Sequence, residues 1–150
     1  MKKNLDQEFE KLVAELKEDE QALKMKNFIQ HGSVTTYDHC LSVARKSLEL
    51  ARAWRLRVDE RALVRAAFLH DFYLYDWHKK GDHLHGYHHP KIASELADLH
   101  FHLSKKEKQI IRSHMWPLTL FHAPASKEAA IVCIADKLCS AKETVSGRRK

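Results

Sequence analysis

The sequence predicts an all-α fold, a single compact domain of about six helices. Apolar residues recur at spacings of three and four along most of the chain, which is the pattern of amphipathic helices. No segment alternates apolar and polar residues as a half-buried strand does, and only four glycines and three prolines occur in 150 residues. A chain of this length forms one domain that is large enough to bury a core.

The first helix is expected over residues 4–31. Asn4 and Gln7 have the spacing of a capping box, no glycine or proline interrupts the charged stretch that follows, and Gly32 provides a C-terminal stop. Residues 1–32 are therefore predicted to be an N-terminal helix that packs on the domain.

Five further helices are expected, over residues 36–55, 59–70, 90–102, 104–115 and 126–145. Ser33, Thr35 and Thr36 are the cap candidates for the first of these helices. The other four start with an aspartate, a proline at the first position, a Ser-x-x-Glu capping box and a serine. Residues 72–89 lack helical periodicity and are rich in aromatic residues and histidine, and a loop of that length is often functional. Residues 146–150 are expected to be a frayed basic tail.

The chain is basic, with 26 Lys and Arg against 20 Asp and Glu and a formal net charge of +6. Between Arg45 and Arg65, seven basic residues accompany three acidic ones. Such a run is either the solvated face of a helix or a surface that attracts an anion. Positive charge also suits nucleic acid, but we recognise no nucleic-acid-binding motif or stacking platform, so we do not expect nucleic acid as the partner.

The cysteines indicate a reducing compartment. Cys40, Cys133 and Cys139 are odd in number and form no C-x-x-C pair, which disfavours both a disulfide framework and a Cys/His zinc site, and we expect the last two to be small core residues. Acidic residues from Asp6 onward interrupt any signal-peptide apolar segment, and no run of 18 apolar residues occurs. We expect a cytoplasmic protein that does not bind a membrane.

Twelve histidines are more than solubility or packing requires, and imidazole is the commonest metal ligand in proteins. Three ionisable residues lie three and four positions after apolar residues of their own predicted helices, namely His70, His114 and Asp136. A single inward histidine is more often a hydrogen-bonded core residue, but a buried carboxylate needs a cation, a proton or a metal. Together the three residues indicate a metal site in the core.

Three further residues join them. Asp71 directly follows His70, and His39 lies at the edge of the apolar stripe of the second helix. His89 precedes Pro90 at a position where Ser, Thr, Asp or Asn usually caps a helix. Local reasoning leaves open whether His89 stands there by accident or has another role.

The order of these residues along the chain resembles that of the HD-domain metal-dependent phosphohydrolase superfamily, in particular its five-histidine, dinuclear branch. The segments that carry the resemblance are TTYDHCLSVA, AAFLHDFY, HHPKIASELA, IIRSHMW and IADK. A His-Asp pair alone would be a weak signal, whereas the full order on successive helices is a strong one. The resemblance covers residues 33–145.

The resemblance implies an all-helical, HD-domain-like fold whose core holds one or two divalent transition metals, with Fe, Mn, Ni, Co and Zn as candidates. The implied metal ligands are His39, His70, Asp71, His89, His114 and Asp136. Asp71 would bridge two metals and is the implied catalytic residue. His85 and His88 remain alternatives to His89, and Met115 stands where some branches have a second histidine, which would leave the second metal with one ligand fewer.

The resemblance also implies the reaction, the hydrolysis of a phosphate ester or anhydride by metal-activated water. A nucleotide or a dinucleoside polyphosphate is the expected substrate. The segments MWPLTLFHAP and FYLYDW lack the GYP motif and the lysine of the superfamily's cyclic-dinucleotide phosphodiesterases, which argues against that substrate class. The net positive charge suits a small phosphorylated substrate.

Four residues are candidates for substrate binding. Lys79 and Lys80 could neutralise phosphate and Trp77 and Trp116 could stack on a base, although each could equally belong to a solvated loop or the core. The remaining histidines are expected mostly at the surface: His31, His78, His83, His100, His102 and His122. Of these, His78, His83 and His122 could line a pocket. The alternative function is a catalytically silent, metal-bound module that binds nucleotides or a protein partner.

Overall fold

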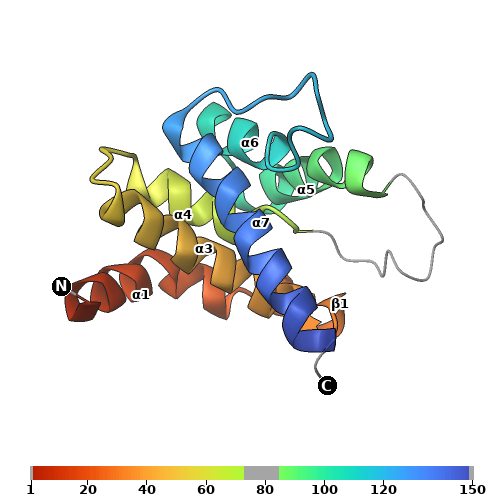
Figure 1. The fold of residues 1–150 in the computed structure, drawn as a ribbon, viewed down its shortest axis with the longest axis horizontal. Coiled ribbons are helices and arrows are strands. Elements are labelled where there is room, and N and C mark those ends of the chain that lie inside the picture. Colours follow the sequence, from red (N-terminus) through yellow and green to blue (C-terminus); the bar gives the residue numbers. More distant parts are fainter. Residues whose placement is uncertain (1, 73–84, 149–150) are drawn as a thin grey trace.

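In the computed structural model, which describes residues 2–72 and 85–148, the regular secondary structure is helical apart from one short hairpin. Its elements in chain order are α1 (Lys2–Glu18), α2 (Glu20–Leu23), the 3-10 helix η1 (Lys24–Asn27), β1 (Ile29–His31), β2 (Val34–Thr35), α3 (Thr36–Ala53), α4 (Glu60–Leu69), α5 (His85–Phe101), α6 (Lys105–Arg112) and α7 (Lys127–Arg148). The helices pack directly on one another around a shared apolar core (Figure 1), so the predicted all-α fold is confirmed. No helix in this part of the chain is both long enough and apolar enough to span a bilayer.

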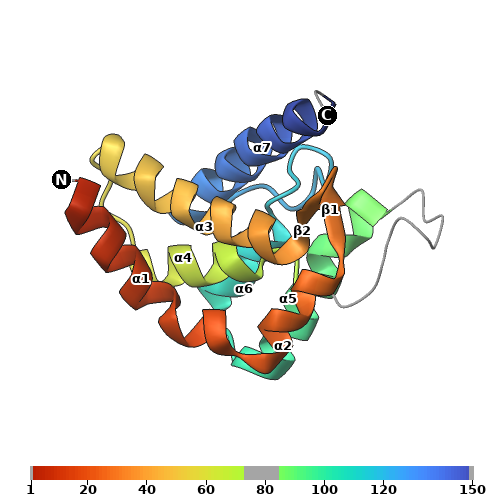
Figure 2. The same cartoon turned by 90° about the horizontal axis from the view of Figure 1, so that it is seen from below.

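The single helix predicted over residues 4–31 is wrong. α1 ends at Glu18, and the carboxylate of Asp19 accepts hydrogen bonds from the backbone N–H groups of Gln21 (2.8 Å) and Ala22 (3.1 Å). An aspartate that bonds the backbone in this way competes with the preceding helix and caps a new one. The chain therefore changes direction after α1, into α2 (Figure 2).

A two-stranded hairpin replaces the end of the expected first helix. β1 pairs antiparallel with β2, and Gly32, at a φ of 57°, lies in the turn between them. Glycine adopts this left-handed angle without a steric cost. Both strands contact α3, and β1 also contacts α7, so the hairpin carries Gln30 into the interior of the molecule and leaves His31 half-buried.

The centre of the fold is α3, which lies against both α4 and α7 (Figure 2). α3 begins as predicted, because Thr35 Oγ1 accepts a hydrogen bond from the Asp38 N–H at 3.1 Å. α4 begins one residue after Asp59, whose carboxylate accepts from the Ala62 N–H at 3.1 Å. These caps fix where the two helices begin, and the apolar residues at helical spacing along them decide which side chains turn inward.

α5 begins at His85, so the prediction of a helix start at Pro90 is wrong. Pro90 lies inside the helix, where its missing N–H costs one backbone hydrogen bond. His89 therefore belongs to the body of a helix and not to a cap position. Most of the loop expected over residues 72–89 lies outside the described residues.

α6 opens with the predicted capping box. Ser104 Oγ accepts from the Glu107 N–H (3.1 Å), and the Glu107 carboxylate accepts in return from the Ser104 N–H (2.9 Å). The other carboxylate oxygen of Glu107 pairs with Nε of Arg65 on α4 at 2.9 Å. The helix ends at Arg112, before the expected end at Met115.

Replacing Glu107 by alanine is expected to lower the free energy of unfolding by about 1–3 kcal/mol, because the capping box is lost and Arg65 loses its carboxylate. Urea denaturation of this variant and of Glu107→Gln measures the effect. Glutamine keeps an oxygen for the Ser104 N–H and should recover part of the loss. An alanine variant as stable as the wild type would show that Glu107 does not stabilise the contact between α4 and α6.

α7 is the longest helix of the described chain, with 22 residues. It runs past the expected end at Val145 to Arg148 and crosses the molecule diagonally in Figure 1. It packs on α3, α4 and α6, so one helix reaches most of the elements that carry the predicted ligands.

Candidate metal centre

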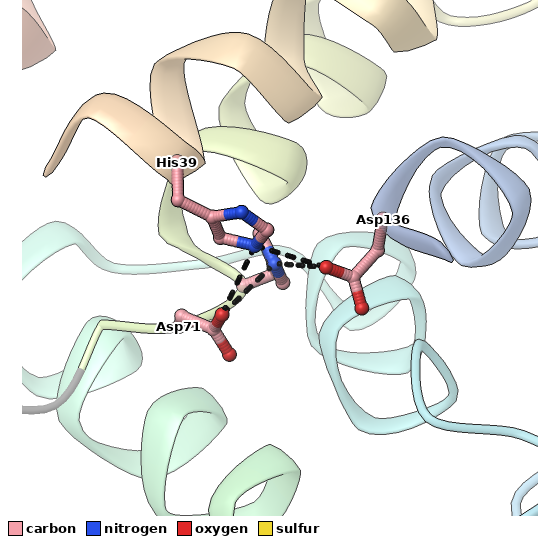
Figure 3. A group of neighbouring side chains, drawn as sticks. His39, Asp71 and Asp136 are labelled. Atoms are coloured by element: carbon pink, nitrogen blue, oxygen red, sulfur yellow. Dashed lines mark hydrogen bonds and ion pairs between the residues drawn. The ribbon is translucent and has the colours of Figure 1, made fainter. Parts of the chain in front are cut away.

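Six ionisable side chains meet in the interior of the helical domain. They are His39 on α3, His70 and Asp71 at the end of α4, His89 on α5, His114 after α6 and Asp136 on α7. Each of them is at most 6% exposed. Figure 3 shows three of them pointing toward one another from separate segments. The structure therefore brings together all six residues that the sequence singled out as ligand candidates.

The first group consists of four of these residues, whose ligand atoms all lie within 4.8 Å of one another: His39, His70, Asp71 and Asp136. Nε2 of His39 is 2.9 Å from Oδ1 of Asp136 and 3.4 Å from Oδ2 of Asp71. Nε2 of His70 is 3.2 Å from each of the same two oxygens. Two imidazole nitrogens and two carboxylate oxygens thus face a common centre.

The second group consists of Asp71, His89 and His114. Nε2 of His89 is 3.1 Å and Nε2 of His114 is 3.5 Å from Oδ1 of Asp71. The two imidazole nitrogens are 2.8 Å from each other. Asp71 therefore turns Oδ2 toward the first group and Oδ1 toward the second, which is the arrangement of a carboxylate placed between two cation sites.

The ring orientation of two histidines follows from the backbone. Nδ1 of His70 lies 2.6 Å from the carbonyl oxygen of Ala67, and Nδ1 of His114 lies 2.6 Å from that of Ile111. A carbonyl oxygen only accepts, so Nδ1 carries the proton and donates in both rings. When either ring is neutral, the lone pair of Nε2 therefore faces the centre, as a metal ligand must.

The electrostatics of the first group pair cationic histidines with anionic carboxylates. Burial alone would lower the pKa of His39, but its hydrogen bonds to Asp136 and Asp71 raise the pKa well above 6.5. Burial likewise lowers the pKa of His70, and the adjacent charge of Asp71 outweighs it and raises the pKa well above 6.5. His114, in the second group, has a lowered pKa because of its burial.

The two carboxylates show the opposite shift. Burial would raise the pKa of Asp71, but the charges of His70 and His89 hold it well below 3.8. The pKa of Asp136 also lies well below 3.8, because His70 and His39 outweigh its burial. The carboxylates are therefore ionised at neutral pH and need positive charge beside them, which either protons on histidine or a metal can supply.

The donor set fits divalent metals. Imidazole nitrogen and carboxylate oxygen together suit first-row transition metals, and nothing in the set selects among Fe, Mn, Ni, Co and Zn. Oδ1 of Asp71 is buried and accepts no hydrogen bond within the described residues, although two imidazole nitrogens face it. A cation between Asp71, His89 and His114 would satisfy this oxygen.

A pocket of about 540 Å³ opens directly onto both groups. Among the described residues, its lining consists of Gln30, His31, Asp71, His89, Met115, Pro117, Leu118, Asp136, Lys137 and Ser140. Ligand candidates thus form one side of the pocket, and the turn after α6 contributes an apolar side. A molecule in this pocket would contact the residues of the candidate metal centre.

Sequence reasoning missed Gln30. Its side-chain amide Nε2 donates to Oδ2 of Asp71 at 3.1 Å, and its Oε1 accepts from Oγ1 of Thr36 at 3.3 Å. Gln30 lies in the segment that was expected to be part of a helix, and no pattern in the sequence marks it. Lys137 and Ser140 were also missed, although both lie within four residues of Asp136 and share its helix.

The structure also places His31 and Trp116 relative to the pocket. His31 was expected at the surface, whereas it is half-buried, lines this pocket and contacts the ring of His39 edge-on at 5.5 Å between centroids. Trp116 is 38% exposed and is not among the described residues that line the pocket. The other three substrate-binding candidates, Trp77, Lys79 and Lys80, lie outside the described residues.

The fold and the site define a class of protein, an all-α domain with a buried cluster of histidine and aspartate able to hold divalent metals. A family model of the HD domain matches residues 36–141, which is more than half of the chain. The protein belongs to the HD domain family. Searches of curated proteins and of solved structures gave no significant match.

Proposed function

We propose that this protein is a metal-dependent phosphohydrolase that cleaves a phosphate ester or anhydride of a nucleotide or a dinucleoside polyphosphate. The observation that carries the proposal is the placement of Asp71, whose two oxygens face two histidine-containing groups at the wall of an open pocket. Membership of the HD domain family supports it, because metal-dependent phosphohydrolases are typical of that family.

The residues divide the work as follows. His39, His70, Asp71 and Asp136 would hold one metal, and Asp71, His89 and His114 a second. Divalent metals so held lower the pKa of water and stabilise charge on phosphoryl oxygens. The protein side chains would fix the positions of both metal ions in a buried site, where electrostatic stabilisation is stronger than in water.

The pocket supports a substrate that combines a phosphate with an apolar, flat group. Its volume lies within the range of small-molecule sites, about 300–1,000 Å³. Lys137 lines it and is exposed, with Nζ 3.3 Å from the carbonyl oxygen of His114, so a cation stands close to the metal groups. Met115, Pro117 and Leu118 offer an apolar surface that suits the face of a nucleobase. The net charge of +6 would attract the anionic substrate.

An assay of the purified protein with defined metals tests the proposal. The protein is stripped with a chelator, reloaded separately with Mn²⁺, Co²⁺, Ni²⁺, Zn²⁺ or anaerobic Fe²⁺, and offered a generic phosphodiester, nucleoside phosphates and a dinucleoside polyphosphate. We expect hydrolysis of at least one nucleotide with a loaded metal and none in the stripped protein. Metal bound with no turnover of any substrate would contradict the enzyme, and nucleotide binding under those conditions would support the silent binding module instead.

A further inference from the structure

Three histidines of the candidate metal centre differ in the hydrogen-bond acceptor that their Nδ1 atoms face. His70 and His114 each donate to a backbone carbonyl three residues earlier in the chain. Nδ1 of His39 instead faces a carboxylate oxygen, Oε2 of Glu143, at 2.8 Å. The Glu143 side chain is only 10% exposed, so this contact is shielded from water.

Glu143 comes from α7, the helix that also carries Asp136. The two residues are seven positions apart, which is about two helical turns, so they lie on the same face. Ser140 lies between them on that face and donates from Oγ to Oδ1 of Asp136 at 3.4 Å. A single helix therefore provides both the carboxylate beside Nε2 of His39 and the carboxylate beside its Nδ1.

We propose that Glu143 is a positioning residue for the metal centre: its carboxylate accepts a hydrogen bond from the Nδ1–H of His39 and thereby directs Nε2 of that ring at the other ligands of the first group. This inference rests on the proposed metal site and extends it to a residue outside the family match, which ends at residue 141. A carboxylate behind a ligating imidazole fixes the tautomer and the ring plane and makes the ring a stronger donor to the metal. Of the two histidines of the first group, His39 would then be the stronger electron donor to the metal, since the carbonyl that faces Nδ1 of His70 carries no charge.

The geometry of this contact argues against Glu143 as a ligand of the first metal. Nε2, not Nδ1, of His39 faces Asp136 and Asp71. Glu143 stands behind the ring, so it would not share a metal with those two carboxylates. His31, Glu143 and Nδ1 of His39 do lie close enough to one another to hold an ion, but the 2.8 Å contact is the distance of a charge-assisted hydrogen bond.

The test measures metal affinity and not activity. Glu143→Ala and Glu143→Gln are prepared in a His89→Ala background, which should retain the first group alone, and titrated with Co²⁺ against a competing chromophoric chelator. We expect Glu143→Ala to weaken Co²⁺ binding about 10–100-fold. Glu143→Gln should recover part of the affinity, because its amide oxygen still accepts from Nδ1 but carries no charge. Glu49→Gln, which removes an α3 carboxylate paired only with Arg45 and Lys46 in the described structure, should have no effect.

Thermal unfolding of the metal-free variants separates positioning from folding. The proposal expects similar melting temperatures for metal-free Glu143→Gln and its parent. Unchanged Co²⁺ affinity in Glu143→Ala would overturn it, and so would a glutamine variant as weak as the alanine variant. An additional metal bound by the wild type and lost in Glu143→Ala would show that Glu143 is a ligand. A wild type that binds Co²⁺ but hydrolyses nothing would contradict the phosphohydrolase while leaving the role of Glu143 intact.

Discussion

Replacing Asp71 by asparagine is expected to abolish hydrolysis and to weaken the binding of both metals. Asp71 is the residue that faces both groups, with Oδ2 3.2 Å from Nε2 of His70 and Oδ1 3.1 Å from Nε2 of His89. Asparagine has nearly the same shape but no charge and only one oxygen, so it cannot serve both groups. Removing a residue that hydrogen-bonds to a metal ligand typically lowers activity about 10–100-fold. Because Asp71 is itself a proposed ligand, the loss of kcat/KM in Asp71→Asn should be larger.

Metal analysis and steady-state kinetics on the same protein samples measure this effect. His89→Ala is the matched comparison, because His89 belongs to the second group alone. We expect Asp71→Asn to lose affinity at both sites and His89→Ala to lose one metal and keep the other. Full metal content together with wild-type turnover in Asp71→Asn would show that this carboxylate does not hold the metals.

The affinity for metal is expected to rise steeply with pH, because metal and protons compete for the same histidines. The pKa values of His39 and His70 in the metal-free protein are raised well above 6.5, since the neighbouring carboxylates outweigh burial. Each ring must lose its Nε2 proton to bind a metal. Every proton displaced contributes up to about a tenfold change in affinity per pH unit, so two contribute up to ~100-fold.

The same pKa shifts determine how the free energy of unfolding of the metal-free protein depends on pH. A histidine with a raised pKa stabilises the folded state fully below about pH 6.5, and this contribution is lost as the pH rises through the folded-state pKa. The lowered pKa values of Asp71 and Asp136 contribute stability that is lost only as the pH falls through those values. His114, whose pKa is lowered, opposes the other histidines: it destabilises the folded state below about pH 6.5, and this penalty disappears as the pH rises to that value.

Thermal unfolding of the metal-free and metal-loaded protein between pH 5 and pH 9 tests the competition. We expect the melting temperatures of the two forms to converge at low pH, where protons occupy the histidines, and to separate as the pH rises. A separation that does not depend on pH would contradict protonated histidines in the metal-free centre. A chelator control at each pH ensures that the metal-free samples hold no residual metal.

Local signals in the sequence were sufficient for most helices and for the inward residues. The caps at Asp59 and Ser104 formed where they were predicted, and Thr35 is the one of three candidates that caps α3. The apolar residues three and four positions earlier in each helix place His70 and Asp136 toward the core, where the structure has them. Such predictions succeed because the cause and its effect lie within a few residues of each other.

The features that sequence reasoning missed depend on contacts between distant segments. Gln30 reaches Asp71 across 41 positions, and Glu143 reaches His39 across 104. A glutamine near the end of a charged stretch, or a glutamate on the last helix, looks like an ordinary surface residue until the fold places it. The break at Asp19 was missed because an aspartate suits both a charged helix face and a cap.

The position of bound metal in a crystal of the loaded protein tests the account most directly. Anomalous scattering recorded at the absorption edge of the loaded metal identifies the element and locates each ion. We predict two peaks on opposite sides of the Asp71 carboxylate, one beside the Nε2 atoms of His39 and His70 and the other beside those of His89 and His114. A single peak, or peaks away from Asp71, would contradict a centre bridged by this residue.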